Sequence, residues 1–391
     1  MDHIRVNRIR IALEAAHLDA LVVRLPENVL LLSGFWPMIG AATLVFPQEG
    51  KSVCITPECF LNEAMAGLWE AEIRPYPFGV LNSPDSTKIV GDIVSEIARD
   101  KGWKRVGYEG SFSMIAPSWH SGEARVLNEQ TRNFYEAIFP GCLLIDATSL
   151  LQTERRRKTE YETEKLRIAS EISCFGLRTF ELAVEPGISG VELAALVERE
   201  VMVRGSGYKG ASRVRGYAQV ATGAEESAIG YRMNEISTRR TLKSGDIALL
   251  ELGVVADGYW ADRTRARVAG QPSDEQARVF DTVCRAQAAA IAAIKPRATC
   301  GEVDGAARAV IEEAGYGKEF LHITGHGLGF AYHEPSPILA PGSSESLEEG
   351  NLISVEPGVY FVPVGGIRLE EDVIVTASSS EVLGPFPQKL A

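Results

Sequence analysis

Helical and strand periodicities alternate along the first part of the chain. Residues 4–18 and 86–102 carry apolar residues at helical spacing. The short apolar runs LDALVVRL, TLVFP, KSVCITP and RVGYEG are typical of strands. Because alternating helices and strands are typical of α/β domains, we predict a small α/β domain over residues 1–150.

The pattern changes after this region. The charged stretch TERRRKTEYETEKLRIASEI carries acids and bases at i,i+4 spacing, which favours a solvated connecting helix. Glycine-rich strands and longer helices follow it. Segregated strands and helices indicate an α+β domain, which we predict over residues 151–391. Its helices are predicted near residues 163–184, 189–204, 273–295 and 301–314.

Three acids, Glu251, Asp257 and Asp262, lie within an apolar segment, LLELGVVADGYWADRTR. Asp257-Gly258 is a strong signal for a two-residue hairpin loop. With that loop, Glu251 lies opposite Thr264 and on the same sheet face as Asp262. Two such carboxylates repel each other unless a cation bridges them, they share a proton, or both face water. The segment alone leaves these three alternatives open.

The stretch LHITGHGLGFAYHEPSP contains three of the six histidines of the chain, His322, His326 and His333. Its glycines allow close approach of the backbone to a ligand. Histidine is the side chain most suited to proton transfer near neutral pH and is a common metal ligand. Three histidines this close together favour a binding or catalytic site.

Two later segments add acids. LISVEPGVYF places Glu356 at the end of a strand, and GGIRLEEDVIV predicts a strand with Arg368, Glu370 and Asp372 on one face. Four carboxylates and one imidazole suit two divalent ions such as Mn²⁺, Co²⁺ or Zn²⁺. Two adjacent ions can hold a bridging hydroxide and polarise a carbonyl. The expected ligands are Glu251, Asp262, His326, Glu356 and Glu370.

These motifs resemble, in the same order, those of the creatinase / aminopeptidase P / prolidase family (M24), the pita-bread hydrolases. LPENVLLLSGFW is similar to a segment of the creatinase-type N-terminal domain. ELGVVADGYWADRTR, TGHGLGFAYHE, SVEPGVY and GIRLEEDV are similar to the metal-binding motifs of the catalytic domain. The resemblance implies a pita-bread catalytic domain, preceded by a smaller α/β domain of the creatinase type, and a homodimer.

The resemblance also implies residue roles. Asp262, His326, Glu356 and Glu370 match metal ligands, and Glu251 takes the first ligand position. His333 matches a histidine that contacts the substrate carbonyl, and His322 matches one that assists proton transfer. Arg368 matches an arginine that braces the acids, and Glu356 also takes or relays the proton of the attacking hydroxide.

The chain departs from the family's peptidases at two positions. Glu251 stands where they have an aspartate, and its extra methylene moves the carboxylate. Gly230, in TGAEESAIGYR, stands where they have a histidine. Tyr231 or Arg232 are candidates to replace that histidine, and the sequence does not choose between them.

The motifs predict a metal-dependent hydrolase of small C–N substrates, acting on Xaa-Pro peptides as a dipeptidase or aminopeptidase. The alternative is a metal-independent hydrolase of a small amide or amidine, similar to creatinase or ectoine hydrolase, with Glu251 acting on the substrate. A non-catalytic pita-bread binding module is the third possibility, and the retained ligands weigh against it.

Composition and charge limit the classes of binding partner. The net charge of −12 argues against nucleic acid and anionic membranes as partners. The first residues lack the apolar core of a signal peptide, and no run of 18 uncharged apolar residues occurs. We therefore expect a cytoplasmic protein.

Overall fold

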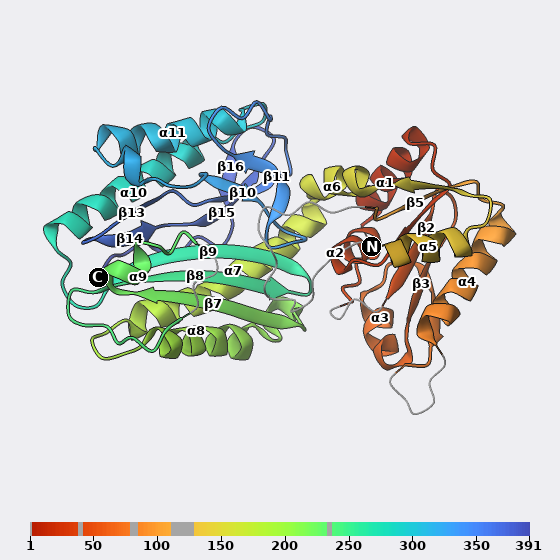
Figure 1. Ribbon diagram of the computed structural model, residues 1–391, viewed down its shortest axis with the longest axis horizontal. Helices are drawn as coiled ribbons and strands as arrows, with labels where there is room; N and C mark the ends of the chain where they lie inside the picture. Colours follow the sequence, from red (N-terminus) through yellow and green to blue (C-terminus); the bar gives the residue numbers. More distant parts are fainter. Residues whose placement is uncertain (1, 38–41, 79–84, 111–128, 233–236) are drawn as a thin grey trace. The chain divides into compact units, whose positions relative to one another are not determined.

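The computed structural model describes residues 2–37, 42–78, 85–110, 129–232 and 237–391 (Figure 1). The chain divides into two compact units, Met1–Arg155 and Arg156–Ala391. Each unit is described by itself.

The first unit is built on one six-stranded sheet of order β4-β3-β2-β1-β5-β6. The β1–β2 and β2–β3 pairs are antiparallel, and the β3–β4, β1–β5 and β5–β6 pairs are parallel. Its strands are β1 (Ala20–Val23), β2 (Thr43–Pro47), β3 (Ser52–Pro57), β4 (Ala71–Tyr76), β5 (Arg105–Tyr108) and β6 (Leu143–Asp146).

Helices and strands alternate in this unit, in agreement with the predicted pattern. Apolar residues of β1, β2, β3 and β5 form a buried core with α4 and α5, and the acid Asp85 caps α4 by accepting from the backbone of Thr87. The helices are α1 (His3–Ala15), α2 (Pro26–Ser33), α3 (Leu61–Gly67), α4 (Ser86–Lys101), α5 (Glu129–Ile138) and α6 (Thr148–Arg156), with a 3₁₀ turn η1 (Glu58–Phe60).

The second unit has two groups of helices, visible at the lower and upper edges of this unit in Figure 1. Four of its helices begin with a reciprocal capping box, in which a Ser or Thr and a Glu or Gln three residues later satisfy each other's backbone N–H groups. The capped helices are α7 (Glu160–Ala183), α8 (Gly190–Gly205), α10 (Asp274–Ala293) and α11 (Cys300–Glu313). The short elements are α9 (Gly223–Ser227), η2 (Tyr208–Gly210) and η3 (Gly317–Glu319).

One sheet of this unit consists of β7 (Val214–Thr222), β8 (Ile247–Ala256) and β9 (Tyr259–Val268), all antiparallel. The predicted Asp257-Gly258 loop joins β8 to β9, and the predicted register is confirmed. Asp257 and Gly258 both have a positive φ, as this loop type requires. Glu251 lies opposite Thr264 and Gly253 lies opposite Asp262.

The β7–β9 sheet is buried on both faces. Leu250 and Leu252 of β8 pack in a core with α7 and α8. Ile247 and Leu249 point to the other face and pack in a second core with α10 and α11. Since side chains alternate along a strand, Glu251 shares the second face with Leu249. This explains how a strand that reads as fully apolar carries a carboxylate toward the interior.

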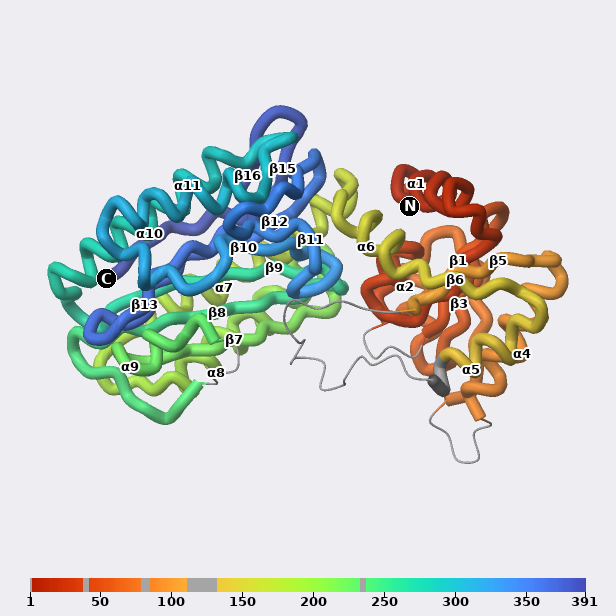
Figure 2. The backbone as a smooth tube through the Cα atoms, turned by 45° about the horizontal axis from the view of Figure 1, so that its top comes forward, coloured from red at the N-terminus to blue at the C-terminus, as the bar shows by residue number. Residues whose placement is uncertain are grey.

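A five-stranded sheet of order β11-β10-β12-β15-β16 and the β13–β14 hairpin complete the unit. In the tube view of Figure 2, β10 and β12 lie close to β8 and β9. The strands are β10 (Gly325–Gly327), β11 (Glu334–Leu339), β12 (Leu352–Val355), β13 (Gly358–Phe361), β14 (Gly365–Arg368), β15 (Glu371–Val375) and β16 (Ser380–Val382).

Two predicted elements were wrong. GGIRLEEDVIV is two strands in different sheets, β14 and β15, because the chain leaves the hairpin after Arg368. The charged stretch is also not one solvated helix: α6 ends at Arg156, Arg157 forms a bridge with Asn351, and α7 begins at Glu160. Lys158 between them is buried beside Glu334, with 3.6 Å between Nζ and Oε2.

No helix in the described ranges is both long and apolar enough to cross a membrane.

Candidate metal centre

The five predicted ligands converge in the second unit. Their donor atoms, together with those of His333, form three overlapping groups, within each of which the atoms lie within 4.8 Å of one another. The groups are Asp262/His326/His333, His326/Glu356/Glu370 and Glu251/Asp262/Glu370. Five different strands or strand ends supply these ligands: β8, β9, β10, the end of β12, and the link between β14 and β15.

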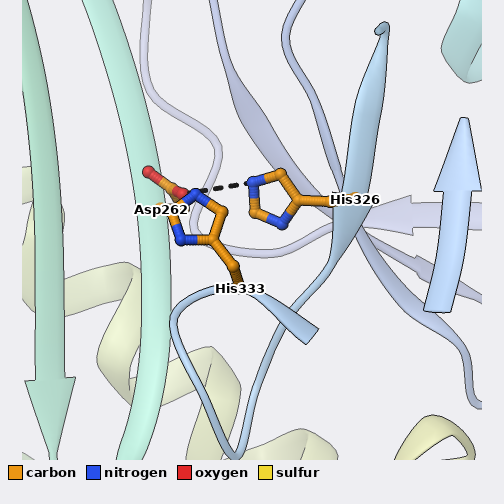
Figure 3. Close-up of side chains that lie close together, drawn as sticks. All are labelled: Asp262, His326 and His333. Carbon is orange, nitrogen blue, oxygen red and sulfur yellow. Dashed lines mark ion pairs between the residues drawn. The ribbon is translucent and has the colours of Figure 1, made fainter. Parts of the chain in front are cut away.

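His326 faces the carboxylate of Asp262 (Figure 3) and that of Glu356. Its Nδ1 lies 2.9 Å from the Gly327 carbonyl, which can only accept, so Nδ1 carries the hydrogen. Nε2 then lies 3.6 Å from Asp262 Oδ2 and 3.5 Å from Glu356 Oε1. Ligands of a tetrahedral ion held at about 2.0–2.2 Å lie roughly 3.3 Å apart. Each of the two carboxylate oxygens therefore lies close to ligand spacing from His326 Nε2.

Two further oxygens support a cation here. Asp262 Oδ2 and Glu370 Oε1 are buried and have no hydrogen-bond partner among the described residues. A buried carboxylate oxygen without a partner is costly, and a divalent ion would compensate for it. The side chains present thus fit a divalent cation.

The pKa values of three acids follow from the same crowding. Burial raises the pKa of Asp262 well above its usual range, and the charges of Glu251 and Glu356 raise it further. Burial and the charges of Asp262 and Glu356 likewise raise the pKa of Glu370. Burial also raises the pKa of Glu356, partly offset by His326 and Arg368. A bound cation would favour the ionised forms of all three.

Glu251 has protein partners on both oxygens. Oε2 accepts from the Arg368 guanidinium and, at 2.8 Å, from the Thr264 hydroxyl. Oε1 lies 2.6 Å from the Tyr332 hydroxyl. Burial would raise the pKa of Glu251, but Arg368 and the two hydroxyls lower it to about 2. Glu251 is therefore an ionised carboxylate in a fixed set of hydrogen bonds.

Tyr332 is a site residue that the sequence analysis missed. Its buried hydroxyl also lies 2.8 Å from Asp262 Oδ1, so it bridges the two carboxylates of the hairpin. The residue stands directly before His333 in a motif that was singled out for its histidines. An aromatic residue in an apolar context gives no sign of its contacts, so only the fold could reveal it.

His322 lies in a hydrogen-bonded chain behind the ligands. Its Nδ1 donates to the Ile323 carbonyl at 2.7 Å, so Nε2 accepts from the Tyr360 hydroxyl at 2.9 Å. Tyr360 in turn accepts from Arg368 Nη1 at 2.9 Å. Burial and the nearby Arg368 charge lower the pKa of His322 to about 3. His322 is therefore neutral at physiological pH.

His333 stands on the open side of the ligand group. Its ring centroid lies 4.3 Å from that of His326 and 4.5 Å from that of Tyr332. The side chain is only partly buried. Figure 3 shows its ring beside Asp262 and His326.

The Gly230 position has no space for a side chain. A Cβ there would lie 2.7 Å from Leu249 Cδ2. Its carbonyl accepts from Arg368 Nη1 at 3.3 Å. Tyr231 packs against Tyr360, with centroids 5.4 Å apart, and Arg232 lies over the Tyr231 ring.

Comparison with known proteins identifies the domains. Residues 164–377 match the family described as metallopeptidase family M24, and residues 5–156 match the creatinase/prolidase N-terminal domain. Both the predicted family resemblance and the predicted fold class, a pita-bread catalytic domain of the α+β class with a smaller α/β domain before it, are confirmed.

Similar proteins span the whole chain. A putative dipeptidase, YkvY, of Bacillus subtilis is 30% identical over 99% of both chains. A solved Xaa-Pro dipeptidase from Bacillus anthracis matches with a TM-score of 0.81 and 26% identity, covering 99% of this chain and 98% of that one. The X-Pro aminopeptidase of Thermotoga maritima also has a TM-score of 0.81, with 26% identity over 97% of this chain and 99% of that one. The chain therefore belongs to metallopeptidase family M24.

Proposed function

We propose that the protein is a divalent-metal-dependent peptidase that cleaves Xaa-Pro dipeptides. The observation that supports the proposal is that His326 Nε2 faces Asp262 Oδ2 at 3.6 Å and Glu356 Oε1 at 3.5 Å, close to the spacing of metal ligands. The substrate class is supported by similar proteins named as a dipeptidase, an Xaa-Pro dipeptidase and an X-Pro aminopeptidase.

The proposed ligands form two overlapping positions for Mn²⁺, Co²⁺ or Zn²⁺. We define the His326 position as the space between His326 Nε2, Asp262 Oδ2 and Glu356 Oε1, next to Glu370. We define the Glu251 position as the space between Glu251, Asp262 and Glu370. Metal bound in such a centre activates water and polarises the scissile carbonyl.

The protein's own residues complete the chemistry. Glu356, with a raised pKa, accepts a proton from the attacking water and passes it to the leaving amine. His333, at the open side, donates a hydrogen bond to the substrate carbonyl oxygen as negative charge develops. Arg368 holds Glu251, and His322 Nε2 accepts a hydrogen bond from the Tyr360 hydroxyl, through which it can exchange a proton.

The metal-independent alternative is less well supported. It requires Glu251 to act on the substrate as base or nucleophile. Both Glu251 oxygens accept hydrogen bonds from Arg368, Thr264 or Tyr332, and the pKa of about 2 makes Glu251 a weak base. That mechanism also leaves unexplained why one buried oxygen of Asp262 and one of Glu370 have no hydrogen-bond partner among the described residues.

We also make proposals for the domain boundary, the oligomeric state and the cellular location. The domain boundary is proposed near residue 150, with the catalytic domain over residues 151–391. We further propose a homodimer, which light scattering on the purified protein tests, and a cytoplasmic location, which cell fractionation tests.

Hydrolysis of dipeptides by metal-depleted and reconstituted protein tests the function. We expect Ala-Pro to be cleaved after addition of Mn²⁺, Co²⁺ or Zn²⁺, and Ala-Ala to be a poor substrate. Ala-Pro-Ala distinguishes a dipeptidase from an aminopeptidase, since only the latter releases alanine from it. Full Ala-Pro activity in chelator, or no Ala-Pro cleavage with any of the three metals, would contradict the proposal.

Asp262→Asn provides the ligand variant and Asp281→Asn the matched control. Asp262 is fully buried in the centre, whereas Asp281 is on the surface of α10 in a salt bridge with Arg285. We expect the first substitution to abolish hydrolysis and the second to leave it unchanged. Equal activity of the two variants would remove Asp262 from the mechanism.

A further inference from the structure

We propose that the Tyr332 hydroxyl and the Arg368 guanidinium take the place of an ion at the Glu251 position. The resting protein then holds one tightly bound divalent ion, at the His326 position. This inference rests on the proposed function, because it concerns how the same centre distributes metal between its two positions.

The two positions differ in the spacing of their oxygen and nitrogen atoms. At the His326 position, Nε2 lies 3.6 Å and 3.5 Å from the two carboxylate oxygens, and no hydrogen joins these atoms when the acids are ionised and the imidazole is neutral. At the Glu251 position, the Tyr332 hydroxyl lies 2.6 Å from Glu251 Oε1 and 2.8 Å from Asp262 Oδ1. These are hydrogen-bond lengths, so the hydroxyl oxygen lies between the two carboxylates.

One of the three carboxylates at the Glu251 position is already paired with a cation of the protein. The Arg368 guanidinium pairs with Glu251 Oε2, and its Nε donates to Thr264 Oγ1 at 3.0 Å. Thr264 Oγ1 in turn lies 2.8 Å from both Glu251 Oε2 and Glu370 Oε2. An ion entering here would meet a buried positive charge and would have to displace hydrogen bonds to charged oxygens.

The Tyr332 ring is packed so that its hydroxyl stays between the carboxylates. The ring lies over Gly253, where a Cβ would be only 2.8 Å from Tyr332 Cε2. It also packs against Trp260 and His333, with centroid distances of 5.4 Å and 4.5 Å. Gly253 is the cross-strand partner of Asp262, so the backbone itself provides the space for the ring. The packing of the Tyr332 ring therefore fixes its hydroxyl within the centre.

The hydrogen bonding of Asp262 and Glu370 supports an ion at the His326 position and protein groups at the Glu251 position. Asp262 contributes Oδ1 to the Tyr332 hydroxyl and leaves Oδ2 without a hydrogen-bond partner among the described residues. Glu370 likewise gives Oε2 to Thr264 and leaves Oε1 without one. Each of these two acids thus has one oxygen within hydrogen-bond distance of a protein hydroxyl and leaves the other for an ion.

Retention of Mn²⁺ after passage through metal-free buffer tests the inference. Full-length wild-type protein should retain one equivalent by elemental analysis, with the six-line electron paramagnetic resonance spectrum of an isolated Mn²⁺ ion. Tyr332→Phe removes both hydroxyl contacts and keeps the ring. In that variant we expect the second Mn²⁺ to bind about tenfold or more tightly than in wild type, with a spin-coupled spectrum at two equivalents.

Tyr316→Phe is the matched control. Its hydroxyl donates to Glu275 Oε1 at 2.6 Å, and neither residue belongs to the ligand groups. We expect it to bind Mn²⁺ as wild type does. Two retained, spin-coupled equivalents in wild type, or identical second-ion affinity in wild type and Tyr332→Phe, would overturn the inference and leave the proposed function standing. Retention of no Mn²⁺, Co²⁺ or Zn²⁺ by wild type would overturn both.

Discussion

His326 Nε2 lies 3.6 Å from Asp262 Oδ2, and no hydrogen joins the two atoms when Asp262 is ionised and the imidazole is neutral. Hydrogen bonds from their backbone N–H groups help to hold both residues in place. The Asp262 N–H donates to Asp372 Oδ1 at 3.1 Å, and the His326 N–H donates to Ser354 Oγ at 3.1 Å. Two acceptors held face to face are stable only with a cation or an extra proton between them.

Divalent metal should therefore stabilise the fold. A ligand at 100 times its dissociation constant adds about 2.7 kcal/mol to the free energy of unfolding. For a unit of this size, that corresponds to roughly 5–10 °C in melting temperature. Differential scanning calorimetry with Mn²⁺ and with chelator measures it.

Asp262→Asn should remove most of this metal-dependent shift, and the surface substitution Asp281→Asn should preserve it. A melting temperature that is the same in Mn²⁺ and in chelator for wild type would show that the cluster binds no metal.

Arg368→Leu should strongly destabilise the protein. It leaves the largely buried, ionised Glu251 without its guanidinium partner, and breaking a buried pair costs about 3–5 kcal/mol. Arg285→Leu, which breaks an exposed pair with Asp281 on α10, should cost about 0–1 kcal/mol. Urea denaturation of both variants measures the difference. Similar losses for the two would refute a buried, charged Glu251–Arg368 pair.

Gly253→Ala should displace the Tyr332 ring. The added Cβ would lie 2.8 Å from Tyr332 Cε2, and overpacking of this kind costs about 1–3 kcal/mol. Gly305→Ala is the control, because its Cβ meets nothing within 4 Å and α11 gains helix propensity of about 1 kcal/mol. Thermal unfolding should move in opposite directions in the two variants. A neutral Gly253→Ala would mean that the ring does not lie over this glycine.

His322 should make the protein less stable at acid pH. Its pKa is lowered to about 3 in the fold, against about 6.5 in the unfolded chain. Above pH 6.5 neither state is protonated, so His322 has no effect there. As the pH falls from 6.5 toward 3, only the unfolded state takes up the proton, and stability is lost.

His322→Gln removes this titration and keeps a hydrogen-bond acceptor for Tyr360. Between pH 7 and pH 4 the variant should lose about 3 kcal/mol less stability than wild type. Parallel curves of unfolding free energy against pH would place the His322 pKa near its ordinary value.

Local signals were enough to predict the framework of the site. Asp257-Gly258 fixed the register of β8 and β9, and therefore the shared face of Glu251 and Asp262. The order of the motifs identified the family, and the residues it named as ligands lie in the candidate metal-binding groups. These features depend on residues close together in the sequence, or on recognisable motifs.

Contacts between distant segments were not predictable in the same way. Tyr332 reaches Glu251 across 81 positions, and its role depends on the space above Gly253. The chain leaves the β14 strand after Arg368, although the alternation of residues continues through it. Lys158 interrupts a charged stretch because it is buried beside Glu334, which charge patterning cannot reveal.

The location of bound metal tests the central claim most directly. Anomalous diffraction from crystals grown with Mn²⁺ should give a strong peak between His326 Nε2, Asp262 Oδ2 and Glu356 Oε1. A peak only elsewhere, or an empty centre in protein that cleaves Ala-Pro, would contradict the account.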